Sequence, residues 1–375
     1  MGVGQRPPRR DAWAACCCGA CCAVPGGAVK LALDAKIFVS GHNEVVGRAL
    51  TRHLQHLGYT NIVTREERAP GGWEPAAVNA FFEEHLPDYV FLIPVSLSSN
   101  DSLTPATWLR HALMMVTSVI HAAYLYETDR LLCIDCDPTL FDPTLHDPAQ
   151  HDPVQGDGGY LQAELIAESQ RAREASGTIM TELCDSYRTQ YGCHFSSALA
   201  GGLYGPGLWL DAPRGNLVSA LFRKVLQASE TGQSTVHLYG HSASPCNLLY
   251  IDDLADACLF LIEHLSEAGR LVIRPGERHT LRQLAETIKA VTGYRGDFSF
   301  DSPASLQDGA QREPQPFGRG LAREEQGETG RLSRAGWFPE TTLEGGFRKT
   351  YRWFQRNRTD LLRPEPVPTV SLRHG

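Results

Sequence analysis

A glycine-containing turn near the start of the chain is the first stretch whose residue types and spacing suit binding chemistry. Gly41-His-Asn-Glu-Val-Val-Gly47 follows the short apolar run Lys36–Ser40 and leads into a predicted helix that ends near His56. In a dinucleotide site, the first glycine makes a tight turn, the last lets the helix pack closely on the sheet, and the diphosphate lies at the helix N-terminus. A tight turn without a ligand is the alternative. The predicted cofactor contacts come from Gly41, His42, Asn43 and Gly47.

Two arginines follow the next predicted strand, Asn61–Thr64. Arg65 and Arg68 could hold the additional 2′-phosphate that distinguishes NADP from NAD, and solvated loop charges are the alternative. We select Arg65 as the cofactor contact.

A five-residue repeat between 137 and 158 places Asp-Pro at 137, 142, 147 and 152, directly after the predicted strand Arg130–Ile134. Proline cannot donate to a strand ladder or continue a helix, so the repeat predicts an irregular, extended loop. A metal site would draw on Asp142, His146, Asp147, His151 and Asp152. Because such a tract has no preset coordination geometry, we favour a solvated insertion and predict no metal.

Composition excludes several classes of protein. The chain has 375 residues and a net charge of −8, which gives no basic surface for nucleic acid or anionic membranes. No apolar stretch after residue 35 is long and clean enough to span a bilayer. Of eleven cysteines, five lie between 16 and 22 and six are scattered, which indicates a reducing compartment rather than a disulfide framework. Residues 1–34 are interpreted as an N-terminal extension that is disordered, targeting or acylated.

The elements that must position these residues alternate between strand and helix from residue 36 to about 205. This spacing predicts an α/β fold with a Rossmann-like, doubly wound parallel sheet. The pattern then becomes mixed, which predicts a second, smaller α+β lobe. The predicted domains are 35–205, of dinucleotide-binding type, and 206–362, mainly a substrate lobe, followed by a tail at 363–375.

Several stretches, in order and over both lobes, resemble one family. They are Val39–His42 with Val45–Gly47, Ser186–Gly192, Leu203–Pro206, Tyr250–Ala255, Val291–Gly296 and Arg331–Trp337. In these residues the chain resembles the GDP-L-fucose synthases, NADPH-dependent epimerase-reductases of the extended short-chain dehydrogenase class. The resemblance covers about 36–362 and implies a GDP-4-keto-6-deoxymannose substrate. It also implies two reactions: a Cys/His pair inverts two carbons, and NADPH then reduces the ketone with a Tyr as proton donor.

The catalytic residues that the resemblance implies do not match this sequence. A Tyr needs a nearby cation to shuttle protons at neutral pH, and the class supplies a Lys one helical turn later. Here Arg173 and Gly177 stand at the Tyr and Lys positions, and no lysine occurs between Lys36 and Lys224. The rival pair, Tyr160 with Glu164, offers a carboxylate in place of the cation.

Other positions that the resemblance marks are also altered. Cys136 stands at the Ser position, Pro138 at the Cys position and Asn216 at the His position. Cys246 stands where an Arg grips the substrate diphosphate, and Val95–Ser99 replace a glycine-bearing substrate loop. Glu44 replaces the middle glycine of the cofactor turn and adds bulk and negative charge.

We therefore predict a divergent, catalytically inactive relative with a structural or binding role, in which NADP binding is weak or lost. The alternatives are an active NADP-dependent enzyme of this family with relocated residues and a related nucleotide-sugar epimerase or reductase. The expected partners are a second copy or an active relative, paired through the long helices, and possibly a GDP-sugar. For this pairing we note an apolar stripe of Ala112, Met115, Val119 and Ala122, with core packing as its alternative. The expected location is the cytoplasm, or an organelle or membrane reached through the N-terminal extension.

Overall fold

The computed structural model describes residues 30–42, 44–65, 72–94, 105–137, 158–208, 217–238, 242–243, 245–264, 270–273, 277–300 and 331–361. Within these residues the central feature is a six-stranded sheet with the order β2-β1-β3-β4-β5-β10. Every neighbouring pair of strands in it is parallel. The Rossmann-like fold predicted from the sequence is confirmed.

The sheet strands are short and apolar. They are β1 (Ile37–Val39), β2 (Ile62–Val63), β3 (Tyr89–Leu92), β4 (Arg130–Asp137), β5 (His194–Gly201) and β10 (Arg270–Ile273). All residues of β1 and β3 are buried, as expected for strands covered on both faces. The strand order reverses between β1 and β3, and ligands of open α/β sheets bind beyond the carboxyl ends of the strands at such a point.

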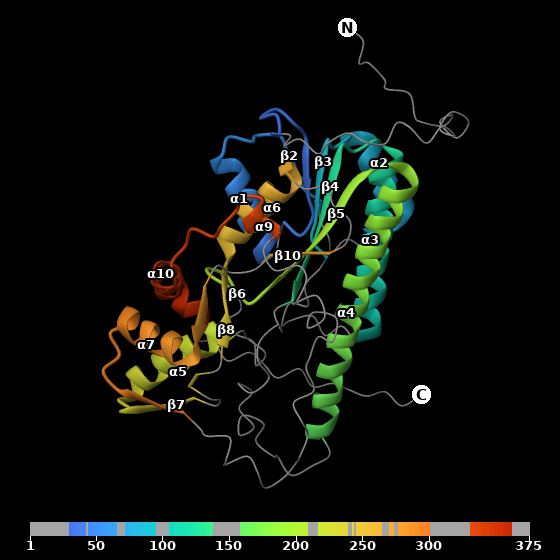
Figure 1. Cartoon of the computed structure of the whole chain (residues 1–375). Coiled ribbons are helices and arrows are strands. Elements are labelled where there is room, and N and C mark those ends of the chain that lie inside the picture. Colours follow the sequence, from blue (N-terminus) through green and yellow to red (C-terminus); the bar gives the residue numbers. More distant parts are fainter. Residues whose placement is uncertain are drawn as a thin grey trace, which may run out of the picture.

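Helices cover both faces of the sheet (Figure 1). One face packs against α2 (Pro75–His85), α3 (Pro105–Leu125) and α4 (Gly158–Tyr191), whose Phe82, Met115 and Met180 share a core with Phe38 and Leu92.

The opposite face packs against α1 (Val45–His56) and α6 (Ile251–His264). Leu50 and Leu261 share the second core with Ile37, Leu132 and Ile134. Because successive strand side chains point to opposite faces, one short strand supplies both cores.

The chain beyond residue 205 contributes to both parts of the molecule. Strand β10 pairs with β5 and α6 covers the sheet, so this stretch completes the sheet layer. The domain division at 205 stays a prediction.

The smaller lobe contains α5 (Leu217–Thr231), α7 (Leu281–Thr292) and α10 (Leu343–Leu361) (Figure 1). Its strand pairs are β7 (Thr235–Leu238) with β12 (Asp297–Phe300), and β8 (Pro245–Asn247) with β11 (Arg278–Thr280). A third pair joins β6 (Leu203–Tyr204) to β9 (Leu249–Tyr250). Helix α7 begins with a capping box between Thr280 and Gln283 and ends at Gly293, whose φ is 74°.

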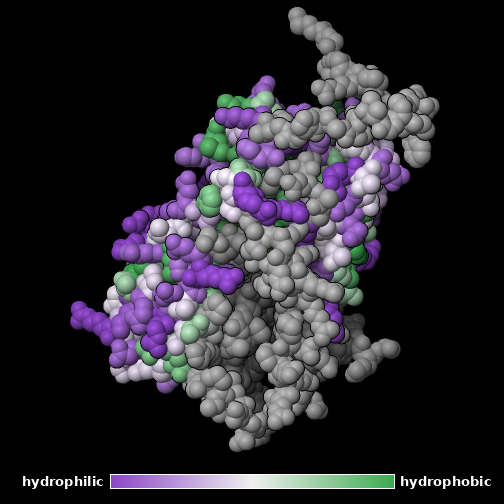
Figure 2. Space-filling model, in the orientation of Figure 1, coloured by the Kyte–Doolittle hydropathy of each residue, from purple (hydrophilic) through white to green (hydrophobic). Residues whose placement is uncertain are grey.

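The visible face of the molecule is largely hydrophilic over the smaller lobe (Figure 2). The large hydrophobic side chains that are exposed among the described residues are Leu33, Leu57, Leu86, Leu125, Ile179 and Phe338. Among the described helices, none is long and apolar enough to cross a membrane.

Candidate cofactor and active-site region

The predicted cofactor turn directly follows β1, beside the carboxyl end of its neighbour β3. Ser40, fully buried, joins the two strand ends: its hydroxyl donates to the Ile93 carbonyl at 3.2 Å and accepts from the Ile93 N–H at 2.7 Å. Gly41 follows with φ of 67°, and a Cβ there would lie 3.2 Å from the Ile93 Cβ. Only glycine adopts this backbone conformation readily in so tight a space.

Gly47 brings the first turn of α1 onto the strand end. A Cβ at Gly47 would collide with the carbonyl oxygen of Gly41. His42 adds an Nδ1 atom that is buried and has no hydrogen-bond partner among the described residues. A bound phosphate or ribose oxygen would supply that partner, so the turn itself fits a dinucleotide diphosphate.

Glu44 opposes this fit. It precedes α1 with extended backbone (φ −83°, ψ 160°), and its side chain makes no capping hydrogen bond to the helix. The helix N-terminus favours an anionic ligand, and a carboxylate at its first position competes for the same partial positive charge. Asn43 lies outside the described residues.

Arg65 lies two residues after β2, at the carboxyl edge of the sheet. Its guanidinium donates to the Ala77 carbonyl at 2.9 Å and lies over the Trp73 and Phe81 rings, at 5.6 and 5.4 Å from their centroids. Burial lowers the pKa of Arg65 from its ordinary value, although an arginine remains charged at neutral pH. These contacts occupy one terminal guanidinium nitrogen and pack the group against two aromatic rings. Arg68 lies outside the described residues.

The end of β4 carries two polar side chains that point to opposite faces. Cys136, at the predicted Ser position, is half-buried against the core beneath α1 and α6. Asp135 faces α4 and forms an ion pair with Arg270 of β10. Pro138 and the Asp-Pro repeat lie outside the described residues.

Arg173 stands on α4 at the position where the resemblance places the proton-donating Tyr. Its guanidinium lies over the ring of Trp108 in α3, 6.0 Å from the centroid. This is cation–π geometry and joins the two long helices. At the position of a proton donor, a guanidinium is a poor substitute for a phenol because it keeps its proton at neutral pH.

Gly177 stands at the predicted Lys position, one helical turn further along α4. A Cβ there would overlap a terminal nitrogen of Arg270 and a carboxylate oxygen of Asp135, and would lie 3.1 Å from the Arg270 Cζ. The positive charge next to Gly177 is therefore that of Arg270 in β10, and the carboxylate of Asp135 pairs with it. Sequence reasoning missed Asp135 and Arg270 because they lie 135 positions apart. The sequence feature that could have indicated this contact is Gly177, a glycine inside a long predicted helix.

The predicted substrate contacts include one residue that the structure describes, Cys246. Cys246, at the predicted diphosphate-gripping position, is 3% exposed, belongs to the core and pairs across strands with His279. Its thiol carries no positive charge for a diphosphate. Asn216 and Val95–Ser99 lie outside the described residues, as do the side chains of Tyr160 and Glu164.

Two buried cysteines, Cys133 and Cys184, lie beside this region. Cys133 and Cys184 have sulfur atoms 3.7 Å apart, beneath α4. Burial raises the pKa of the Cys133 thiol well above its ordinary value, which suppresses the reactive thiolate.

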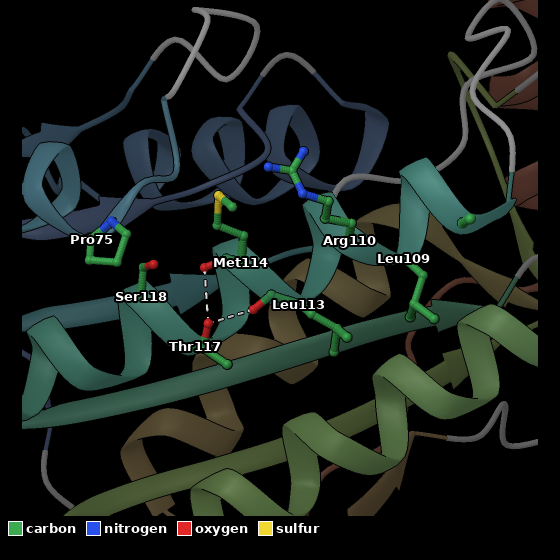
Figure 3. A pocket seen from close by; sticks show the side chains of 8 residues that line it. Pro75, Leu109, Arg110, Leu113, Met114, Thr117 and Ser118 are labelled. Atoms are coloured by element: carbon green, nitrogen blue, oxygen red, sulfur yellow. Dashed lines mark hydrogen bonds between the residues drawn. The ribbon is translucent and has the colours of Figure 1, made fainter.

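Two further features of the described residues were compared with the predicted site: groups that could hold a metal and a groove on the helices α2 and α3. Among the described residues, no group of three or more His, Cys, Asp or Glu is arranged to hold a metal. A groove of about 630 Å³ lies on α2 and α3 (Figure 3). Leu109, Leu113 and Met114 line it with Arg110, and it includes none of the predicted site residues.

Comparison with protein families is decisive for the class of the molecule. Residues 37–273 match the model of the NAD-dependent epimerase/dehydratase family. The chain belongs to this family. Within it, GDP-L-fucose synthase 1 of Arabidopsis thaliana is 30% identical over 329 residues, which cover 86% of this chain and 94% of the relative. GDP-L-fucose synthase of Escherichia coli K12 is 27% identical over 336 residues, with 86% and 97% covered.

Solved structures agree with the fold of this epimerase/dehydratase family member. A GDP-L-fucose synthetase from Naegleria fowleri bound to NADP has a TM-score of 0.64 and 17% identity, covering 90% of this chain and 97% of that one. A GDP-D-glycero-L-gluco-heptose synthase from Campylobacter jejuni, in the presence of NADPH, has a TM-score of 0.61 and 20% identity, covering 87% and 99%. The chain is thus a divergent relative of the GDP-L-fucose synthases.

Proposed function

We propose that this protein is a non-catalytic member of the GDP-L-fucose synthase group, with a structural or binding role. It retains the scaffold and the cofactor turn of an epimerase-reductase. It does not retain the side chains that move protons in the reaction of its relatives.

The observation that carries the proposal is the state of α4 at residues 173 and 177. Reduction of a ketone needs a proton donor beside the carbonyl oxygen, and a phenol serves only if a cation lowers its pKa. Arg173 lies over Trp108, and Gly177 covers the Asp135–Arg270 ion pair. Neither arrangement leaves a phenol and an ammonium group on one helix face.

Ligand binding is proposed to be weaker than in an enzyme of this class. Gly41, His42 and Gly47 would cradle the diphosphate of NADP and Arg65 its 2′-phosphate, whereas Glu44 would repel it. A GDP-sugar remains a possible ligand of the smaller lobe, with Cys246 lowering affinity for its diphosphate.

Location and partner follow the same reasoning. We place the protein in the cytoplasm, because none of the six cysteines in the described residues forms a disulfide. Its partner is a second copy or an active relative. Of the stripe noted in the sequence, Ala112, Met115, Val119 and Ala122 are all buried inside the chain, so they form core and not a contact surface. Pairing would instead use the outer side of α3 and α4.

A turnover assay tests the proposal. Purified chain, free of any co-purifying relative, is mixed with NADPH and GDP-4-keto-6-deoxymannose, and NADPH oxidation is followed beside the Escherichia coli enzyme as positive control. We expect no NADPH oxidation above the rate without protein. The variant Cys136→Ser should remain inactive, since general acid–base groups contribute about 10²–10⁴-fold each and several are absent. Turnover near ~1 s⁻¹, an ordinary enzymatic rate, would refute the proposal.

A further inference from the structure

Three residues from three elements meet beneath the middle of α4. Asp135 belongs to β4, Arg270 to β10 and Gly177 to α4, and the first two form an ion pair. Their side chains are 18% and 15% exposed, so the pair is largely removed from water.

The strand register explains why this pair requires glycine above it. Strand β5 separates β4 from β10, with Leu199 opposite Asp135 and Ser197 opposite Arg270. The ion pair therefore crosses over β5, in the space between the sheet and α4. One turn further along α4, the Thr181 hydroxyl contacts the Ser197 hydroxyl at 3.0 Å, which shows how closely the helix approaches β5.

Glycine is otherwise a poor choice for this position. Within a helix it is less favourable than almost any other residue, because its unfolded backbone has the most freedom to lose. Its φ at 177 is not in the left-handed region, so backbone geometry does not demand it. The requirement comes from the missing Cβ, whose place the Asp135–Arg270 pair occupies.

We propose that Asp135, Gly177 and Arg270 form one coupled unit that fixes α4 to the sheet, and that a side chain at 177 displaces the ends of the Asp135 and Arg270 side chains and weakens their ion pair. This goes beyond the loss of catalysis. A lysine introduced at 177 would have to displace the ends of both side chains, so we expect single-site restoration of the family's cation to cost stability in the present chain.

A double-mutant cycle read by thermal unfolding tests the coupling. In the native background, Gly177→Ala should lower the unfolding midpoint by about 5 °C or more, because it overpacks the site and separates a largely buried ion pair. In the background Asp135→Ala with Arg270→Val, the same change should leave the midpoint unchanged or raise it, because alanine fills vacated space and favours the helix. Gly177→Ala should thus lower the unfolding midpoint in the native background and leave it unchanged or raise it in the pair-deleted background.

Lysine variants extend the cycle. Gly177→Lys should unfold the native background or lower its midpoint even more than alanine, whereas the pair-deleted background should carry it in soluble, folded form. Ala175→Lys, at an exposed position of the same helix, is the matched control and should cost little in both backgrounds. If Gly177→Lys alone cannot be purified, the folded triple variant still supports the coupling, and an unfolded triple variant argues against it.

The inference would be overturned if Gly177→Ala changed the unfolding midpoint equally in the two backgrounds. It would also be overturned if Gly177→Ala did not lower the midpoint of the native background. The readout is stability, so it is independent of turnover. A chain that oxidises NADPH with the keto sugar would refute the proposed function and leave the coupling intact.

Discussion

At the residue scale, several positions where the resemblance to the GDP-L-fucose synthases implies site residues make contacts inside the fold. That 136, 173, 177 and 246 correspond to the family's site positions stays a prediction. Arg173 joins two helices and Cys246 fills the core. We therefore expect single substitutions at Arg173 or Cys246 to disturb these packing contacts.

Glu44 gives a direct residue-scale prediction about the cofactor. Its carboxylate lies at the N-terminus of α1, where the diphosphate of NADPH would bind, and at ~5 Å with an effective dielectric of ~20 each charge pair costs about 3 kcal/mol before salt screening. Glu44→Gly should tighten NADPH binding by about 10-fold or more after screening, measured by titration calorimetry.

Two matched variants separate charge from bulk in this titration. Glu44→Gln removes only the charge and should give part of the gain, more at low salt than at high salt. Glu84→Gln removes one charge from the exposed surface of α2 and should change affinity little. Micromolar binding by the unmodified protein would contradict the role given to Glu44.

At the element scale, the contact of α1 with α6 predicts a pH dependence. Asp256 of α6 lies 3.4 Å from the His53 Nε2 of α1 and accepts a 2.8 Å hydrogen bond from the Trp337 indole N–H. The neighbouring His53, more than Trp337, holds the pKa of Asp256 below its ordinary value of 3.8. A depressed carboxyl pKa contributes to stability above 3.8, and the contribution disappears as pH falls through the folded-state pKa.

Urea unfolding between pH 7 and pH 3 measures this contribution. Asp256→Asn should lower the free energy of unfolding at pH 7 by less than about 1 kcal/mol, because the Asp256 side chain is half exposed, and the difference from the unmodified protein should shrink toward pH 3. Asp253 on the same helix has a raised pKa, from burial first, and acts in the opposite direction. Comparing the two proteins removes the Asp253 contribution. A difference that stays constant with pH would show that Asp256 acts through packing alone.

Much of the element layout follows from sequence pattern, and the exceptions have physical causes. Buried runs such as Tyr89–Ile93 and the alternation with helices predict the parallel sheet. Strands β6, β8, β9 and β11 have only two or three residues each, too few to show a period. For the stripe on α3 both dimer contact and core packing were open, because helical spacing reveals an apolar face and not which neighbour covers it; the structure shows core packing. The Asp135–Arg270 pair was missed because its partners meet only when β4 and β10 flank β5.

At the scale of the whole molecule, the proposed pairing through α3 and α4 predicts a dimer. Ile179 of α4 is 37% exposed, and Met114 and Leu183 on the two helices are partly exposed. Light scattering should give about twice the chain mass of 41.2 kDa, alone or with an active relative. Ile179→Glu should weaken the pair, whereas Leu57→Glu, at a 44% exposed leucine after α1, should not. Finding only monomer, both for the chain alone and for its mixture with an active relative, would refute this proposal.

Strand β10 lies far after β5 in the sequence, which has a consequence for folding during synthesis. A ribosome releases the chain from its N-terminus, so β5 emerges before the covering helix α6 and more than sixty residues before its outer partner β10. Until then the nascent sheet exposes an unpaired edge at β5 and the part of one apolar face that α6 later covers, two features that favour aggregation. A fragment of residues 30–205 should therefore be insoluble or chaperone-bound, whereas a fragment of 30–300 should remain in the soluble fraction after centrifugation. A soluble, cooperatively unfolding 30–205 fragment would show that the sheet completes itself without its last strand.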